Sequence, residues 1–341
     1  MKKKYFSSNY KSFIPSLSTK SNYLMLLIIQ WIWISPIIGQ TKSTTITPYI
    51  PDIVKLFPNV RDLAISPFEN ELYFTIQSRL EECSSIAYCQ LKNGNWTKPE
   101  IAAFSGKYQD MEPFFTPDGL KLFFVSNRPL KDTTTESKDF DIWYIERTNK
   151  SAKWSRPINI GSPINTNNNE FYPTLSSNHN LYFTSDGTNS KGKDDIFMST
   201  WDNGIYSEPI SLSDSINSTG FEFNAFIAPD ESFLLYTAYN RTDGLGSGDL
   251  YVSFNKKNNI WTKSIHLGKE INSSLMDYCP YYNAKSKILY FTSKRSSVTK
   301  QFNKPQNIQA ILMEINQYEY GQSRLYQIPF DPSKYNPTML H

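Results

Sequence analysis

The sequence predicts an all-β protein, a β-propeller made of four-stranded antiparallel blades, on three observations. A hairpin-like motif recurs along the chain, and most copies are followed by similar third and fourth strands. The paired Ile-Asn positions that close three of the copies lie 52 and 55 residues apart. Aromatic residues make up 15% of the 341 residues, which favours strands because large flat side chains fit a pleated, half-buried surface.

The first two strands of each repeat are predicted from two short aromatic and β-branched runs joined by a turn-type loop. The copies are "VRDLAISPFENELYFTIQSR" from Val60, "DMEPFFTPDGLKLFFVSNR" from Asp110, "NEFYPTLSSNHNLYFTSDG" from Asn169, "FEFNAFIAPDESFLLYTAYNR" from Phe221 and "MDYCPYYNAKSKILYFTSKR" from Met276. The copy at Val60 is the weakest, because it lacks the acidic residue at the start.

The third and fourth strands complete each unit. Third strands are expected at Asp141, Asp195 and Asp249, and fourth strands begin at Trp96, Trp154, Tyr206 and Trp261. Four antiparallel strands at this period form one propeller blade, and stacked blades bury the faces that a single sheet leaves wet. Five blades are preferred and six are possible.

The predicted domain limits follow from this repeat. The propeller spans residues 59–330, and residues 331–341 form a C-terminal tail. Residues 40–58 are an N-terminal segment in which "PDIVKLFP", from Pro51 to Pro58, resembles the fourth-strand pattern. That segment is therefore the candidate for completing the last blade and closing the ring.

These residues resemble the TolB-type, WD40-like propeller repeat family, whose unit reads acid-x-x-Pro, Ser-Pro-Asp-Gly, Leu-Tyr-Phe, Ser-x-Arg and Asp-Ile-Tyr. "TPDG" at 116–119, followed by "LFFVSNR", is the nearest copy. The first unit lacks the acid-x-x-Pro, and the fourth has "NAF" in place of the Pro. The resemblance covers about 80% of the chain and implies a propeller fold with a scaffold role in the bacterial envelope.

Residues 1–39 are predicted to be a secretory signal. A basic flank precedes the apolar run from Tyr23 to Gly39, which is short for a membrane span of about 20 residues. An uncleaved N-terminal anchor is the alternative, and it would be the chain's only contact with a membrane. We therefore expect an exported protein that is periplasmic, outer-membrane-associated or secreted.

Repeated polar residues are predicted to meet on one rim, because strands alternate in direction. First strands begin with acids, second strands end with Arg and third strands begin with Asp, so that an Arg would lie between two carboxylates. This structural rim network comprises Asp110, Arg128, Asp141, Glu222, Arg241, Asp249, Asp277 and Arg295.

One repeat departs from this pattern and is the predicted binding site. Gly187 stands where the sibling repeats have Arg, so Glu170 lacks its expected partner. Either Lys191 or Lys193 replaces the Arg, or carboxylates of this repeat face an external ligand. The candidate site residues are Glu170, Asp186, Asp194 and Asp195.

Other chemical signals are weak. The three His residues are far apart in sequence, and no metal-binding or nucleophile motif occurs, so no metal, cofactor or catalytic residue is predicted. Cys83 and Cys89 are a possible disulfide, and the plainer interpretation is that all three cysteines are small buried apolar residues. The net charge of +3 is nearly balanced, which argues against a nucleic-acid partner.

Two functions are left open by these observations. The first is a non-catalytic exported scaffold, not an enzyme, that binds a protein partner in the cell envelope; its oligomeric state is unknown. The alternative is a glycan-binding propeller, or one that processes glycans or peptides, with acidic residues at the tunnel mouth. The alternative requires facing carboxylates with shifted pKa values.

Overall fold

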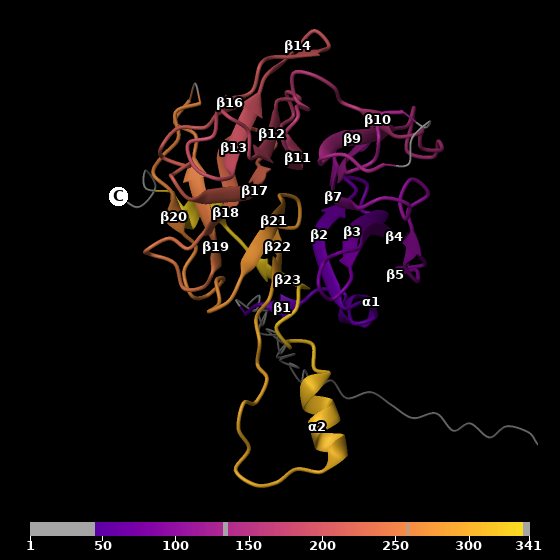
Figure 1. The fold of residues 1–341 in the computed structure, drawn as a ribbon, viewed down its shortest axis with the longest axis vertical. Coiled ribbons are helices and arrows are strands. Elements are labelled where there is room, and N and C mark those ends of the chain that lie inside the picture. The colour runs from indigo at the N-terminus through magenta and orange to yellow at the C-terminus, as the bar shows by residue number, and fades with distance from the viewer. Residues whose placement is uncertain (1–44, 132–135, 258, 337–341) are drawn as a thin grey trace, which may run out of the picture. The chain divides into compact units, whose positions relative to one another are not determined.

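The computed structural model describes residues 45–131, 136–257 and 259–336, where the polypeptide forms five four-stranded antiparallel sheets. These sheets are the blades of a five-bladed β-propeller, which confirms the preferred fold (Figure 1). Their innermost strands contact one another in a closed ring, in the order β2, β7, β11, β17, β21 and back to β2. The predicted signal segment, residues 1–39, lies outside the described residues.

The strands of the first four blades follow one another in sequence order from the axis outward. The first blade is β2 (Asn59–Ile65), β3 (Glu71–Gln77), β4 (Ser84–Lys92) and β6 (Glu100–Ile101), with β5 (Asn95–Trp96) pairing beside β4. The second is β7 (Asp110–Phe115), β8 (Lys121–Ser126), β9 (Asp141–Glu146) and β10 (Ile158–Asn159).

The third and fourth blades repeat this arrangement. The third is β11 (Glu170–Leu175), β12 (Leu181–Ser185), β13 (Asp195–Ser199) and β16 (Ile210–Ser211), with a small hairpin of β14 (Trp201–Asp202) and β15 (Ile205–Tyr206) inserted before its outer strand. The fourth is β17 (Phe221–Ile227), β18 (Phe233–Tyr239), β19 (Gly248–Phe254) and β20 (Ile265–His266).

The last blade joins the two ends of the described polypeptide. Its inner strands are β21 (Asp277–Asn283), β22 (Ile288–Ser293) and β23 (Arg324–Pro329), and its outer strand is the N-terminal β1 (Thr47–Pro48), which pairs with β23. The segment Pro51–Pro58, which we expected to be this strand, instead begins with the helix α1 (Pro51–Val54). Pro51 favours that outcome because proline at the first turn of a helix loses no hydrogen bond.

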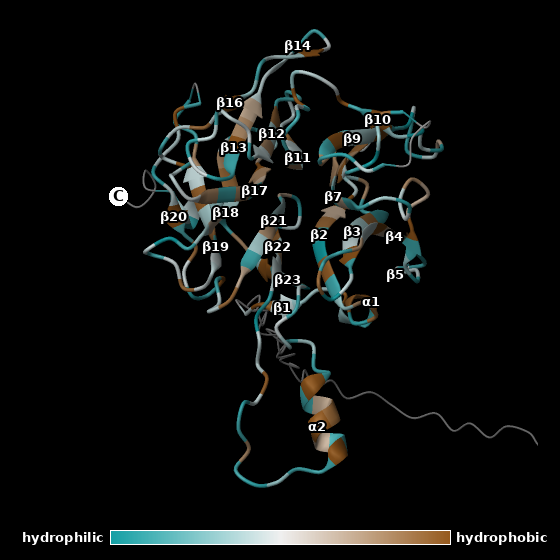
Figure 2. Cartoon of the chain, viewed as in Figure 1, coloured by the Kyte–Doolittle hydropathy of each residue, from teal (hydrophilic) through white to brown (hydrophobic). Residues whose placement is uncertain are grey.

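Two further elements lie outside the blades. Helix α2 (Ile308–Ile315) is inserted between β22 and β23, and the 3₁₀ helix η1 (Pro332–Tyr335) follows β23. Helix α2 contains many apolar residues, so its ribbon is largely brown in Figure 2, and none of its residues is buried. Neither described α-helix has the length and apolar character to cross a membrane.

The core lies between the blades. Aromatic and aliphatic side chains from the second and third strands pack against the next blade, and the largest of them are fully buried, among them Phe74, Phe124, Phe183, Tyr236 and Phe291. This packing holds the inner strands rigidly around the axis, where the candidate site lies.

Candidate functional site at the propeller axis

Each of the five innermost strands has a β-bulge at the same place. The pairing register shifts once in each inner strand, and one residue of each bulge has a left-handed backbone with φ between 48° and 57°. These five equivalent residues are Asp62, Glu112, Tyr172, Asn224 and Cys279. Left-handed backbone is strained for residues other than glycine, by roughly 1–3 kcal/mol each, and such strain clusters at functional sites.

The bulges bring polar side chains together at the axis, and we call Arg61 with the five bulge residues the axial cluster. Arg61 Nε donates to Asp62 Oδ1 at 2.8 Å, and its Nη2 donates to Glu112 Oε1 at 2.7 Å. The backbone N–H of Tyr172 donates to Glu112 Oε2 at 2.7 Å, and Asn224 Nδ2 lies 3.4 Å from Oε1. One guanidinium therefore holds two carboxylates from neighbouring blades.

Burial gives Glu112 an unusual acidity. Asp62 and Glu112 are only 1% and 4% exposed, and burial raises the pKa of Glu112 from 4.5 to about 7, although Arg61 opposes this rise. A carboxyl group that titrates near neutral pH can both donate and accept a proton, as a general acid must. Glu112 is therefore a candidate proton donor.

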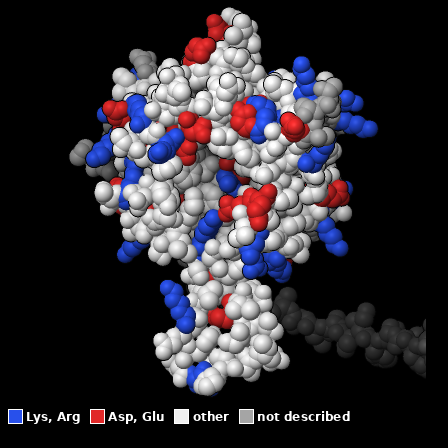
Figure 3. Space-filling view, in the orientation of Figure 1, with Lys and Arg blue, Asp and Glu red and all other residues white. Residues whose placement is uncertain are grey.

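The axial cluster is closed on one side and partly open on the other. The inner-strand residues that follow the bulges include Phe114, Phe226 and Tyr281, whose rings meet edge to face at centroid distances of 6.5 and 5.7 Å. On the other side, the Arg61 side chain is 13% exposed, and the equivalent Phe171 of β11 is half-buried. Figure 3 shows a hollow near the middle of the visible face, with charged atoms at its floor.

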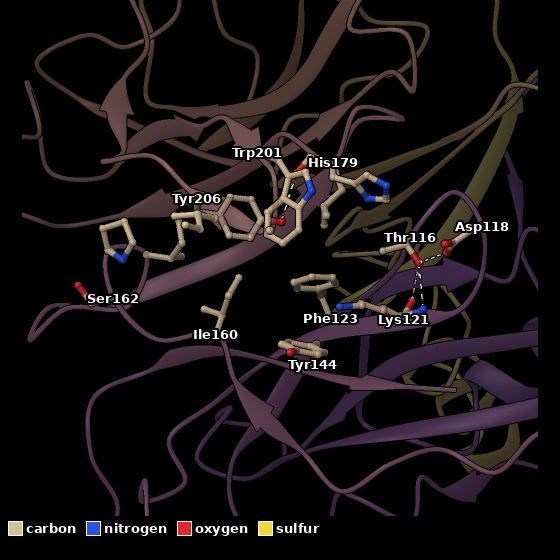
Figure 4. A pocket seen from close by; sticks show the side chains of 15 residues that line it. Thr116, Asp118, Lys121, Phe123, Tyr144, Ile160, Ser162, His179, Trp201 and Tyr206 are labelled. Carbon is tan, nitrogen blue, oxygen red and sulfur yellow. Dashed lines mark hydrogen bonds between the residues drawn. The ribbon is translucent and has the colours of Figure 1, made fainter. Parts of the chain in front are cut away.

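A second hollow lies between the second and third blades, and we call it the aromatic cleft (Figure 4). It has a volume of about 420 Å³. Trp201 and Tyr206 of the β14–β15 hairpin form one wall with ring centroids 4.6 Å apart, and Tyr144 of β9 lies opposite, with Lys121 Nζ 4.5 Å from its ring centroid. Flat aromatic faces beside a few polar groups are typical of a small-molecule site.

The rim residues form pairs of one Arg and one acid, whereas we expected each Arg to lie between two carboxylates. Arg128 Nη2 donates to Asp110 Oδ1 at 2.5 Å, Arg241 Nη2 to Glu222 Oε1 at 2.9 Å, and Arg295 Nη2 to Asp277 Oδ1 at 2.8 Å. Each Arg therefore binds the acid of the first strand and not the Asp of the third. The same Nη2 also donates to a backbone carbonyl, and in Arg128 and Arg295 Nε donates to a serine hydroxyl.

The third-strand aspartates use local partners instead. Asp141 accepts from Lys138 Nζ at 2.6 Å. Asp195 and Asp249 each accept two backbone N–H groups of the preceding loop, at 2.8 to 3.1 Å. These contacts hold the loop onto the blade and do not reach the neighbouring Arg.

The four predicted binding carboxylates do not converge on one ligand site. Glu170 is 1% exposed and lines a cavity. Asp195 is buried and bound by its own loop, whereas Asp186 is exposed and accepts from Asn169. Asp194 pairs with Phe221 through its backbone, and burial together with Asp186 and Asp195 raises the pKa of its side chain.

The possible disulfide between Cys83 and Cys89 does not form. Both are free thiols, and Cys89 lies six residues beyond Cys83 along extended backbone. Six strand residues span about 20 Å, whereas a disulfide needs Cα atoms within about 7 Å. Cys89 and Cys279 are buried, as expected for small apolar side chains, whereas Cys83 is exposed, so that expectation is wrong for Cys83.

Sequence reasoning missed the axial cluster. Its signal is present in the motif, in the third position of acid-x-x-Pro, which changes from repeat to repeat while its neighbours recur. Glu112, Tyr172, Asn224 and Cys279 all stand there. A position that varies inside a repeated motif is free of the scaffold's requirements, so it is a candidate for function.

Comparison with known proteins shows the fold but no family. No family model and no curated protein matches the sequence. A solved glycoside hydrolase matches with a TM-score of 0.51 at 7% identity, covering 79% of this chain and 86% of its own. A Hadza microbial sialidase, Hz136, matches with a TM-score of 0.45 at 13% identity over 70% of this chain and 55% of the sialidase. An exo-1,5-alpha-L-arabinanase from a bovine ruminal metagenomic library matches with a TM-score of 0.40 at 12% identity, over 69% of this chain and 87% of the arabinanase.

The first of these neighbours, the glycoside hydrolase, corrects our functional expectation. We expected a non-catalytic protein-binding scaffold, yet a propeller that matches over most of both sequences is a glycoside hydrolase. The expectation of a non-catalytic scaffold is therefore corrected in favour of its alternative, a glycan-processing propeller, which is proposed below from the residues of this protein. At 7% identity the likeness shows the fold alone, and the activity must be argued from the residues of this protein.

Proposed function

We propose that this protein is a glycan-processing propeller whose reacting carboxyls are Asp62 and Glu112. The observation that carries the proposal is the axial cluster, in which one guanidinium joins two buried carboxyls from neighbouring blades. Glycoside hydrolysis needs a proton donor for the glycosidic oxygen and a second carboxylate that attacks the sugar or activates water. The axial cluster supplies both groups at one point.

The two carboxyls have different roles in this proposal. Glu112, whose pKa lies at about 7, gives its proton to the leaving oxygen as the glycosidic C–O bond breaks. Asp62, which accepts from Arg61 Nε at 2.8 Å, faces the oxocarbenium-like sugar and stabilises its positive charge. Water then adds to the anomeric carbon, and the proton that it loses returns to Glu112. The substrate approaches from the side of Arg61, because the rings of Phe114, Phe226 and Tyr281 close the other side.

The test is hydrolysis by the purified protein of a panel of plant and bacterial polysaccharides, followed by release of reducing ends. Asp62→Asn and Glu112→Gln should each lower kcat by roughly 10²–10⁴-fold, the usual contribution of a catalytic proton transfer, with little change in KM. Glu146→Gln, at an exposed carboxylate on β9, is the matched control and should keep full activity. Unchanged turnover in both axial variants would rule out the assignment.

A second candidate function is glycan binding without cleavage, and the aromatic cleft favours it. Trp201, Tyr206 and Tyr144 offer faces on which sugar rings can stack, and the Lys121 ammonium lies beside them. Binding of a glycan that no condition hydrolyses, and that the axial variants do not affect, would favour this function. Export through residues 1–39, an envelope partner and descent from the TolB-type repeat remain predictions beside either function.

A further inference from the structure

Three blades contain a complete arginine site at the rim. The guanidinium of Arg128, Arg241 or Arg295 binds a buried first-strand acid and a backbone carbonyl, which belong to Phe104, Ile216 and Ile271 respectively. In two of these blades Nε also donates to a serine hydroxyl, that of Ser126 or Ser293. Two aromatic rings, one from the second strand and one from the third, lie 4.6 to 5.8 Å from the guanidinium carbon.

The third blade has the same site without the arginine. Gly187 replaces it, and within the described part of the chain the Glu170 carboxylate accepts only from the backbone N–H and the hydroxyl of Thr166, at 3.1 and 2.7 Å. Lys191, a possible substitute, binds Asp214 and the carbonyl of Leu212 instead. Among the residues that the structure describes, no cation therefore contacts this 1% exposed carboxylate.

A cavity of about 110 Å³ lies where the arginine would be. Its lining includes the third-blade counterpart of every group that the sibling arginines contact, namely Glu170, Ile164, Ser185, Phe183 and Phe197. The rings of Phe183 and Phe197 stack at 5.9 Å and 24°, close to the 6.0 Å and 28° of the pair beside Arg295, Phe291 and Tyr326. The cavity thus keeps the form of a guanidinium site.

We propose that this cavity binds a guanidinium group from outside the protein, seated as Arg128, Arg241 and Arg295 are in their blades. The ligand is an arginine side chain of a partner protein or a small guanidino compound. A guanidinium fits because its planar fork donates to several acceptors in one plane and stacks on aromatic faces, which an ammonium group does not match. Thr188, Asn189 and Glu208 line the mouth and are exposed, so the cavity is open to solvent.

Burial of a lone carboxylate supplies the driving force. Desolvation raises the pKa of Glu170 to about 7, and the nearby Asp139 and Asp141 contribute to the rise. A bound cation offsets the free-energy cost of burying the ionised Glu170 carboxylate and forms charge-assisted hydrogen bonds with it. The proposal is independent of the axial cluster, which belongs to a different part of the inner strands.

The test measures thermal unfolding of the full-length protein at pH 8 with millimolar ethylguanidinium, and with ethylammonium at equal ionic strength as the control cation. Ethylguanidinium should raise the Tm of the wild type increasingly with its concentration, because the stabilisation follows RT ln(1 + [L]/Kd), and ethylammonium should not. Glu170→Gln should abolish the response. Gly187→Arg should also abolish it, because the introduced side chain fills the cavity.

Two features of the protein make this test decisive. Gly187 has no left-handed φ, and a Cβ there would meet its nearest atom, Ser185 Oγ, at 3.3 Å, so Gly187→Arg needs only a small local adjustment. Arg241→Gly empties the same site in the fourth blade and should create a second response to ethylguanidinium. Equal responses to the two cations, or a response that survives in Glu170→Gln, would overturn the proposal.

The source of the guanidinium is decided by a second titration. Tighter binding of an Ala-Arg-Ala peptide than of agmatine would assign the site to a partner's arginine side chain. Tighter binding of agmatine would assign it to a small guanidino compound. Failure of either titration leaves the hydrolysis tests of Asp62 and Glu112 unaffected, because those measure a different site.

Discussion

At the scale of single residues, the same buried carboxylate behaves differently according to its cation. Glu222 and Glu170 occupy equivalent positions, and each accepts from the backbone and hydroxyl of a residue four positions earlier. Only Glu222 also has an arginine, Arg241 at 2.9 Å. A buried charge without a partner is costly, so the third blade carries a local penalty that its neighbours avoid.

This penalty predicts a pH dependence of stability. The pKa of Glu170 rises from 4.5 to about 7 on folding, so over that range the folded protein keeps a proton that the unfolded protein has released. The contribution of the protonated Glu170 to the free energy of unfolding is therefore complete below about pH 4.5 and is lost as the pH rises to 7. Glu170→Gln cannot lose a proton, and at pH 8 its free energy of unfolding should exceed that of the wild type by roughly 1–3 kcal/mol.

Denaturant unfolding from pH 4.5 to pH 8 measures this difference. The curves of the wild type and Glu170→Gln should diverge as the pH rises. Glu208→Gln, at the exposed mouth of the same cavity, is the control and should follow the wild type. If the Glu170→Gln and wild-type curves stay parallel across the range, the carboxylate has a partner in solution.

At the scale of elements, the insertions between strands distinguish one blade from another. The β14–β15 hairpin occurs before the outer strand of the third blade and contributes Trp201 and Tyr206 to the aromatic cleft. Its tip is exposed, with Ile205 71% exposed. The hairpin is therefore suited to contacting a ligand and contributes little to the buried core.

Truncation of the Trp201 ring tests this role. Trp201→Ala should weaken glycan binding by about tenfold, which corresponds to a stacking contribution of roughly 1.4 kcal/mol, and should leave the Tm nearly unchanged. Isothermal titration with a glycan identified in the panel gives the dissociation constant. Ile210→Ala, at an exposed apolar residue outside the cleft, is the control. An unaltered dissociation constant in Trp201→Ala would exclude the cleft from binding.

At the scale of the whole molecule, the ring depends on its closure. β1 pairs Thr47 with Gln327 and Pro48 with Tyr326, and the next residue, Tyr49, donates its N–H to Leu325 O at 2.9 Å. Without β1 the last blade would have an open edge at β23. Closure therefore links the first described residues to the last blade.

Deletion of residues 1–49 should consequently lower the free energy of unfolding by about 2–4 kcal/mol, from lost strand hydrogen bonds at about 1 kcal/mol each and lost burial of Tyr49. Deletion of residues 1–44 keeps β1 and is the matched control. Urea denaturation measures both. Equal stability of the two truncated proteins would show that the strand adds nothing to closure.

Much of the architecture could be predicted from the sequence, because each repeat is recognisable from patterns within a short stretch of residues. Alternating apolar strands, turn residues and a period of about 50 residues each reflect one blade, and a blade is largely a local structure. The first-strand acids and their arginines were predictable for the same reason, since both belong to one hairpin. The error at Pro51–Pro58 arose where a short apolar pattern fits a helix as well as a strand.

The four-stranded blades and the arginine missing at Gly187 could be read from the sequence alone, which favoured five blades and left six possible. The axial cluster and the cavity beside Glu170 became visible only in the tertiary structure. Asp62, Glu112 and Cys279 come from three different blades, and they meet only because the ring closes and the bulges turn their side chains inward. Long-range contacts of this kind have no local pattern, because each residue needs only to be compatible with its own strand.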